Sequence, residues 1–177
     1  MRKAIIIILL LPALCFGGDP TDVLDATRLM YRASRAVDGA QKMLKRDDLA
    51  NIPMGWPCEG GITSPFGYRD HPVWHTWKHH NGIDIGAPYG APVCATGGGT
   101  VTFTGWKWGY GRTVDIEHSP HLVTRYAHLS EITVRVGDVV KRGDWIGDIG
   151  TTGTVTGPHL HYEVRINGEP VDPAGWL

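Results

Sequence analysis

Two histidines stand one residue apart in the stretch GPHLHYEVRINGEPVDP, which covers residues 157–173. The apolar residues Leu160, Tyr162 and Val164 alternate with polar ones, which predicts a β-strand with one apolar and one polar face. Residues i and i+2 of a strand point to the same side, about 6.6 Å apart, so His159 and His161 would share the polar face. Such a pair either meets a metal ion or consists of ordinary exposed histidines, and the pair alone does not decide between the two.

A second stretch, WKHHNGIDIG, places His80 four residues before Asp84, with Gly82 between them. Ile83 and Ile85 flank the aspartate, so on a strand the two isoleucines would point inward and the carboxylate outward. Imidazole and carboxylate are both zinc ligands, and the glycine allows the backbone to turn so that they converge. Together with the later His-x-His pair, this stretch supplies the two histidines and one carboxylate of a catalytic zinc site with a position left for water.

A third histidine segment is YAHL, in which Tyr126 and His128 would share one strand face. A single strand histidine is usually structural or idle, so His128 gains importance only as part of a set. The HExxH signature of helical metalloproteases does not occur in the chain. A metal site would therefore have to be built on strands and loops.

Length and charge limit the classes of function. The chain has 177 residues, 17 Lys and Arg against 18 Asp and Glu, and no long run of either sign. This balance argues against binding of nucleic acid or of an anionic membrane surface by charge. The length suits one compact domain with an appendage, and we expect a monomer.

Residues 1–17 have the pattern of a signal peptide: Arg2 and Lys3, then an apolar run, then small residues. The run is too short to cross a bilayer, which takes about 20 apolar residues, so we expect no transmembrane helix in the mature chain. An uncleaved anchor and lipid attachment at Cys15 are the alternatives. The expected location is outside the cytoplasm, with the periplasm favoured over secretion or attachment to the cell wall.

Residues 18–55 are predicted to form an N-terminal helix and a linker. Asp19 and Pro20 have the types of a helix start, and an apolar stripe with steps of three and four continues to Leu44. Asn51-Ile52-Pro53 then ends the helical segment. The helix from Asp19 to Lys45 could also cover a groove in the following domain.

Residues 56–177 change to short strand-like runs separated by turn residues. The predicted strands cover residues 98–106, 111–118, 121–129, 132–140, 144–150 and 159–166. A hairpin turn is predicted at Ser119-Pro120-His121. The fold class is therefore mainly β, an antiparallel sheet of sandwich or half-barrel type preceded by one N-terminal α-helix.

Cys58 and Cys94 remain once the signal peptide is removed. In an exported, oxidising setting such a pair predicts a disulfide. Two free thiols, with Cys94 as a small buried strand residue, are the alternative.

The ordered series ITSPFGYRDHP, HHNGIDI, APYGAPVCATGGGTV, GYGRTVDIEH, YAHLSEI, VRVGDVVKRGDWIGDIGTTGTVTGPHLHYEV and PVDP resembles the catalytic domain of lysostaphin-type (LytM-like) zinc metallopeptidases. The likeness runs from Gly61 to Pro173. It implies a peptidoglycan endopeptidase whose single zinc ion is bound by His80, Asp84 and His161. By the same likeness His128 and His159 are the catalytic histidines.

The chemistry implied by this likeness is hydrolysis by metal-activated water. Zinc lowers the pKa of bound water from near 16 toward about 7. His128 or His159 would take the proton and return one to the leaving amine, and either could stabilise the oxyanion. The alternative function is a noncatalytic module that keeps zinc and binds the cell wall or regulates other wall hydrolases.

Aromatic residues near the predicted site have two interpretations, packing over the sheet or lining a groove for an extended substrate. The candidates for the groove are Trp74, Trp77, Trp108, Tyr110 and Tyr126. The remaining histidines are interpreted as solvated loop or turn residues; these are His71, His75, His79, His118 and His121. Among them only His79 is a substitute ligand, and its side chain would face away from that of His80.

Overall fold

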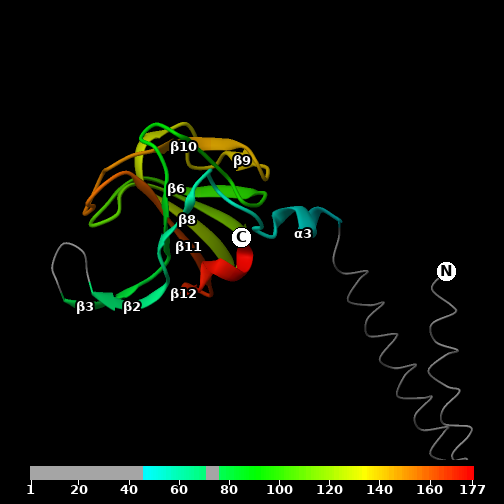
Figure 1. Ribbon diagram of the computed structural model, residues 1–177. Coiled ribbons are helices and arrows are strands. Elements are labelled where there is room, and N and C mark those ends of the chain that lie inside the picture. Colours follow the sequence, from blue (N-terminus) through cyan, green and yellow to red (C-terminus); the bar gives the residue numbers. More distant parts are fainter. Residues whose placement is uncertain (1–45, 71–75) are drawn as a thin grey trace, which may run out of the picture. The chain divides into compact units, whose positions relative to one another are not determined.

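The structure is a computed structural model that describes residues 46–70 and 76–177 (Figure 1). The predicted signal peptide, the predicted helix from Asp19 to Lys45, Trp74, His71 and His75 lie outside these residues. Within them, α3 (Arg46–Asn51) ends at Asn51, where the Asn51-Ile52-Pro53 sequence predicts an end. No helix among the described residues has the length and apolar character needed to cross a membrane.

Antiparallel strands make up most of the described chain, as predicted. The strands are β1 (Gly61–Ser64), β2 (Gly67–Asp70), β3 (Trp77–His80), β4 (Ile83–Gly86), β5 (Pro92–Cys94), β6 (Gly99–Lys107), β7 (Gly111–Ser119), β8 (Leu122–Ile132), β9 (Val139–Val140), β10 (Trp145–Ile149), β11 (His159–Ile166) and β12 (Glu169–Val171). A 3-10 helix, η1 (Pro173–Trp176), follows.

The main sheet has the strand order β1-β4-β11-β8-β7-β6-β9. Strand β10 pairs with β5 and β8, β12 pairs with β11, and β2 and β3 form a separate hairpin. Strand β11 thus lies between β4 and β8, two strands that are far from it in sequence (Figure 1). The predicted hairpin between β7 and β8 is confirmed, since the chain reverses between Ser119 and Leu122.

The core is built from the apolar face of these strands. Ile83 and Ile85 of β4 are buried, as are Leu160 and Tyr162 of β11. These residues alternate with Asp84 and His161, which lie on the other face. Packing of one face therefore determines which side chains the opposite face presents.

Residues 132–140 do not form the single strand that their pattern predicts. Strand β8 continues to Ile132, and only Val139 and Val140 pair again, as β9. The chain turns between them, because Gly137 has φ +95° and the Asp138 carboxylate accepts a hydrogen bond from the Arg135 amide. A turn of this kind interrupts the strand ladder although the residues alternate in polarity.

Tyr126 belongs to the core, so its assignment to a substrate groove is wrong. Its side chain is fully buried, and its hydroxyl accepts a 2.9 Å hydrogen bond from the Thr96 amide. Tyr126 is paired in register with Tyr162, another core residue, and paired residues on neighbouring strands share a face. His118 is also buried rather than solvated, with hydrogen bonds to the Gly98 carbonyl and the Thr124 hydroxyl.

Cys58 and Cys94 are free thiols, in contrast to the predicted disulfide. Their segments are adjacent, since the Cys94 amide donates to the Pro57 carbonyl at 2.8 Å. Burial, followed by the charge of Cys94, raises the pKa of Cys58 to about 12. A thiol that stays protonated is a poor nucleophile for disulfide formation.

The segment between α3 and β1 is held against the sheet. The Met54 amide donates to the Thr96 carbonyl, and the Arg142 guanidinium donates to the carbonyls of Leu49 and Ile52. Part of the predicted linker therefore belongs structurally to the β domain.

Candidate metal centre

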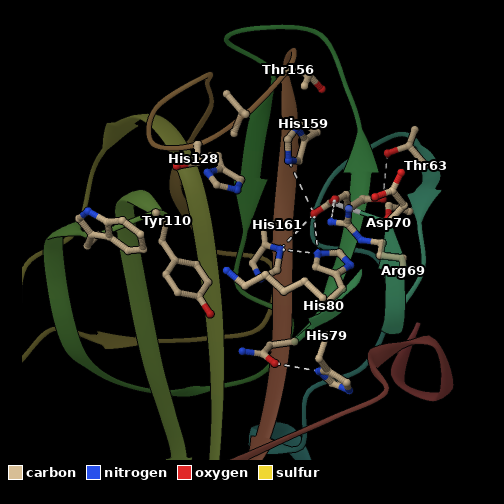
Figure 2. Close-up of a pocket in the computed structure, with 18 residues that line it drawn as sticks. Thr63, Arg69, Asp70, His79, His80, Tyr110, His128, Thr156, His159 and His161 are labelled. Atoms are coloured by element: carbon tan, nitrogen blue, oxygen red, sulfur yellow. Dashed lines mark hydrogen bonds and ion pairs between the residues drawn. The ribbon is translucent and has the colours of Figure 1, made fainter. Parts of the chain in front are cut away.

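Three side chains meet on the polar face of the sheet, and each comes from a different strand. His80 ends β3, Asp84 lies in β4, and His161 lies in β11. Figure 2 shows the His80 and His161 rings next to each other. Asp84 and His161 are register partners, so their side chains are neighbours on one face. Gly82 allows the close approach of the β3–β4 turn to β11, because a Cβ there would lie 2.2 Å from the Tyr162 carbonyl oxygen.

The three polar atoms form a compact triangle. His80 Nε2 lies 3.1 Å from Asp84 Oδ1 and 2.9 Å from His161 Nδ1, and His161 Nδ1 lies 3.0 Å from Asp84 Oδ1. All three residues are buried. A tetrahedral zinc ion with bonds of about 2.1 Å holds its ligand atoms about 3.4 Å apart. The triangle would fit such an ion after opening by a few tenths of an ångström.

In both imidazoles the nitrogen that faces away from the triangle acts as a hydrogen-bond donor. His80 Nδ1 donates to the Pro65 carbonyl at 2.8 Å, and His161 Nε2 donates to Glu163 Oε1 at 3.0 Å. In the neutral rings the facing atoms, His80 Nε2 and His161 Nδ1, therefore both present lone pairs. Two lone pairs and a carboxylate oxygen at these distances repel one another unless a cation or a proton lies between them. The donor set therefore fits a divalent metal.

Asp84 is held as an anion. Burial alone would raise its pKa, but the close contacts with the His161 and His80 rings outweigh burial and lower the pKa far below its usual range. Its second oxygen, Oδ2, lies 3.3 Å from Arg69 Nη2. Arg69 thus orients the carboxylate with Oδ1 toward the two histidines.

His128 and His159 lie beside the triangle and contact each other, with ring centroids 4.9 Å apart (Figure 2). Their Nδ1 atoms donate to backbone carbonyls, His128 to Thr152 at 2.8 Å and His159 to Gly157 at 2.9 Å. Each ring therefore leaves Nε2 as an acceptor. Burial, helped by the neighbouring His161 and His159, lowers the pKa of His128 to about 4, so this ring is neutral at pH 7.

A bulge in β8 directs His128 to the site. Between the pairs Val114 with Tyr126 and Arg112 with Leu129, β8 contains one residue more than β7. His128 has φ +64°, a left-handed conformation that is uncommon for residues other than glycine. The bulge breaks the alternation of the strand, which is why His128 faces the site while Tyr126 faces the core. The prediction that the two share a face is wrong for this reason.

An open groove with a volume of about 500 Å³ surrounds the histidines. Trp108 and Tyr110 line it, as predicted, and Trp108 is 81% exposed. Trp77 is 74% exposed but is not one of the lining residues. Trp106 lies beside a second hollow with Arg112 and Glu131.

His79 also lines the groove, but it does not join the triangle. Its Nδ1 donates to Asn81 Oδ1 at 3.0 Å, and Figure 2 shows the ring apart from His80 and His161. His121 is exposed, as predicted for a turn residue.

Glu163 and Arg69 are parts of the site that the sequence analysis missed. Glu163 lies two residues after His161, and the same alternation that pairs His159 with His161 places it on the same face. Arg69 gives no comparable signal, because it reaches Asp84 from the separate β2–β3 hairpin.

An antiparallel sheet with two histidines and one carboxylate at the floor of an open groove, beside two further histidines, is typical of a metal-dependent hydrolase. Comparison with known proteins identifies the family within this class. The profile of peptidase family M23 matches residues 78–173, more than half of the chain, and the chain belongs to this family.

Similar proteins carry related names. The DD-carboxypeptidase/endopeptidase Mpg of Neisseria meningitidis is 55% identical over 112 residues, which are 63% of this chain and 26% of that protein. The peptidoglycan DD-endopeptidase ShyB of Vibrio cholerae is 46% identical over 112 residues, with the same shares. The crystal structure of a zinc containing peptidase from Vibrio cholerae matches with a TM-score of 0.61 and 43% identity, over 69% of this chain and 38% of that one. The chain thus spans about a quarter of the length of these curated relatives.

Proposed function

We propose that this chain is a zinc-dependent endopeptidase that hydrolyses peptide bonds in bacterial peptidoglycan. The observation that carries the proposal is the orientation of the two imidazoles in the triangle. His80 and His161 turn lone pairs toward Asp84 Oδ1 while their outer nitrogens are used as donors. That arrangement is favourable only around a cation or a proton, and two imidazoles with one carboxylate are the ligand set of catalytic zinc sites.

Zinc in this triangle would activate a water molecule and polarise the scissile carbonyl. The roles that remain fall to the two histidines outside the triangle. His128 is neutral at pH 7 and keeps Nε2 as an acceptor, which suits a general base that takes a proton from the attacking water. His159 Nε2 lies 3.6 Å from Asp84 Oδ1, close enough to the triangle to bind the developing oxyanion when protonated.

The groove suits an extended peptide better than a small ligand. It is open to solvent, and its lining includes the aromatic side chains of Trp108 and Tyr110 and the cationic side chains of Arg69 and Lys78. The names of Mpg and ShyB support a peptide bond between D-amino acids as the one that is cut. Such a substrate is found in the cell wall, in agreement with export guided by residues 1–17 and action in the periplasm.

The test uses the purified chain and isolated peptidoglycan. We expect new amino groups and released peptides, detected by fluorescent labelling and mass spectrometry. A chelator should abolish the release and added zinc should restore it. Mass spectrometry of the fragments identifies the bond, and cleavage at a bond other than a D-amino acid linkage would reject that part of the proposal.

His128→Ala separates catalysis from binding. The variant lacks the proposed base but keeps every member of the triangle, so we expect zinc binding with peptide release reduced by about 10²- to 10⁴-fold. His121→Ala is the matched control, because His121 is an exposed histidine on the β7–β8 turn. If the chain binds zinc and peptidoglycan but releases nothing, and His128→Ala changes nothing, the noncatalytic module is the correct function.

A further inference from the structure

Glu163 is the most deeply buried acidic residue near the site, and the hydrolytic steps assigned above do not use it. Its side chain has no exposed surface. It lies on β11 two residues after His161 and contacts the His161 nitrogen, Nε2, that does not face His80 and Asp84. Burial of a carboxylate is costly unless hydrogen bonds or opposite charges compensate it, so its partners indicate its role.

The two carboxylate oxygens have different partners. Oε1 accepts hydrogen bonds from His161 Nε2 at 3.0 Å and from the Tyr110 hydroxyl at 2.7 Å. Oε2 pairs with the guanidinium groups of Arg165 and Arg125, the latter at 3.5 Å. Oε1 thus accepts the hydrogen bond from the candidate metal ligand His161, while Oε2 is held by the two arginine side chains.

This division determines the state of the His161 ring. A carboxylate accepts but does not donate, so His161 Nε2 must carry the hydrogen, and in the neutral ring Nδ1 is left with its lone pair toward His80 and Asp84. The ring contacts Tyr110 edge to face, with centroids 5.3 Å apart, so rotation is restricted on that side as well. An outer carboxylate of this kind fixes the tautomer of a metal-binding histidine and raises its basicity.

We propose that Glu163 is a positioning residue that sets the zinc affinity of the site by holding His161 in the tautomer and orientation that bind metal, with the Tyr110 hydroxyl holding the same oxygen, Oε1, in turn. The inference rests on the proposed function, because it assigns a metal to the triangle. It predicts that the affinity for zinc depends on a residue that does not touch the ion.

The competing interpretation is that Glu163 only neutralises the two arginines. Arg165→Gln is the matched control for it. This variant removes a charge partner of Oε2 and disturbs the same buried group, but it leaves the hydrogen bond between His161 and Oε1 in place. Arg165 is partly exposed and lies outside the groove.

The test compares the full chain with Glu163→Gln and Arg165→Gln. Zinc dissociation constants are measured by competition with a chromophoric chelator, and the visible spectrum of the cobalt-substituted protein reports the ligand geometry. For Glu163→Gln we expect a dissociation constant about 10- to 100-fold higher and a changed cobalt spectrum. For Arg165→Gln we expect lower thermal stability, with a zinc dissociation constant within about twofold of that of the wild type.

Unchanged zinc affinity in Glu163→Gln, or an equal loss in Arg165→Gln, would overturn the inference. If Glu163→Gln does not fold, the zinc affinity of Tyr110→Phe tests the inference instead, because this variant removes only the hydroxyl that shares Oε1 with His161. A smaller loss of zinc affinity is then expected, and no loss contradicts the proposal. Failure of the wild-type chain to bind zinc would instead refute the proposed function itself.

Discussion

Replacement of Gly153 by alanine should damage catalysis through the backbone, without touching any candidate ligand. Gly153 has φ +82°, and a Cβ there would lie 2.5 Å from the Gly109 oxygen and 2.5 Å from the Gly111 nitrogen. These are backbone atoms, which cannot rotate away as the end of a side chain can. The loop must therefore shift, and with it the Thr152 carbonyl, which accepts the 2.8 Å hydrogen bond from His128 Nδ1.

The size of the effect follows from two costs. A left-handed conformation costs a residue with a Cβ about 1–2 kcal/mol relative to glycine. Forcing an extra methyl group against packed atoms costs about 1–3 kcal/mol more. Gly143→Ala separates the two costs, because Gly143 has φ +88° and no atom within 4 Å of an added Cβ. We expect Gly153→Ala to be less stable than Gly143→Ala by about 1–3 kcal/mol.

The assay is urea unfolding of the metal-free variants, followed by peptide release with zinc present. A displacement of about 1 Å in a catalytic group can cost about 100-fold in rate, so Gly153→Ala should lose activity by one to two orders of magnitude. Gly143→Ala should keep its activity, and both should bind zinc like the wild type. Equal stability of the two variants, or full activity of Gly153→Ala, would refute the reasoning.

Four further predictions use other parts of the chain. Tyr126→Phe should lower the free energy of unfolding by about 1–3 kcal/mol, because the buried Thr96 amide loses its acceptor, with zinc affinity unchanged in a titration. A loss of substrate affinity instead would place Tyr126 in the groove. Burial lowers the pKa of His118 below its unfolded value of about 6.5, so the wild type should lose stability as the pH falls below about 6.5. Melting curves at two pH values should show a smaller loss for His118→Gln, and an equal loss would contradict it. Trp108→Ala should raise KM several-fold with little change in kcat, since Trp108 lines the groove but is not one of the proposed catalytic residues; steady-state kinetics on a peptide fragment measure both constants. Asp84→Asn should weaken zinc binding by more than about 100-fold, and an unchanged dissociation constant would exclude Asp84 as a ligand.

Features set by local periodicity could be predicted from the sequence. The alternation in residues 159–166 correctly placed His159 and His161 opposite Leu160 and Tyr162, because a buried strand needs an apolar face. The same alternation could also have placed Glu163 on the face of His159 and His161. The strand predicted there has the observed bounds, and the residues of the β4 segment also point as predicted.

Features set by distant contacts could not be predicted in this way. His128 departs from the alternation because its amide donates to the Tyr110 carbonyl and its ring donates to the Thr152 carbonyl. Both acceptors are far from it in sequence. Position 128 is also a histidine, and only a glycine there would have indicated a left-handed conformation. The contact between Arg69 and Asp84 is of the same kind, since it depends on how one hairpin packs against another strand.

The register of β11 couples the fold to the chemistry. Strand β11 pairs with β4 so that His161 is opposite Asp84, and with β8 so that His161 is opposite Ala127, whose small side chain leaves room beside the imidazole. A shift of one residue would turn Leu160 and Tyr162 toward the groove and the histidines toward the core. Such a shift would bury two imidazoles and the Glu163 carboxylate in apolar surroundings and expose the largest core side chains. The same apolar contacts that stabilise the sheet therefore hold His161 in line with Asp84, and substitutions that loosen the core at Leu160 should weaken metal binding before they unfold the domain.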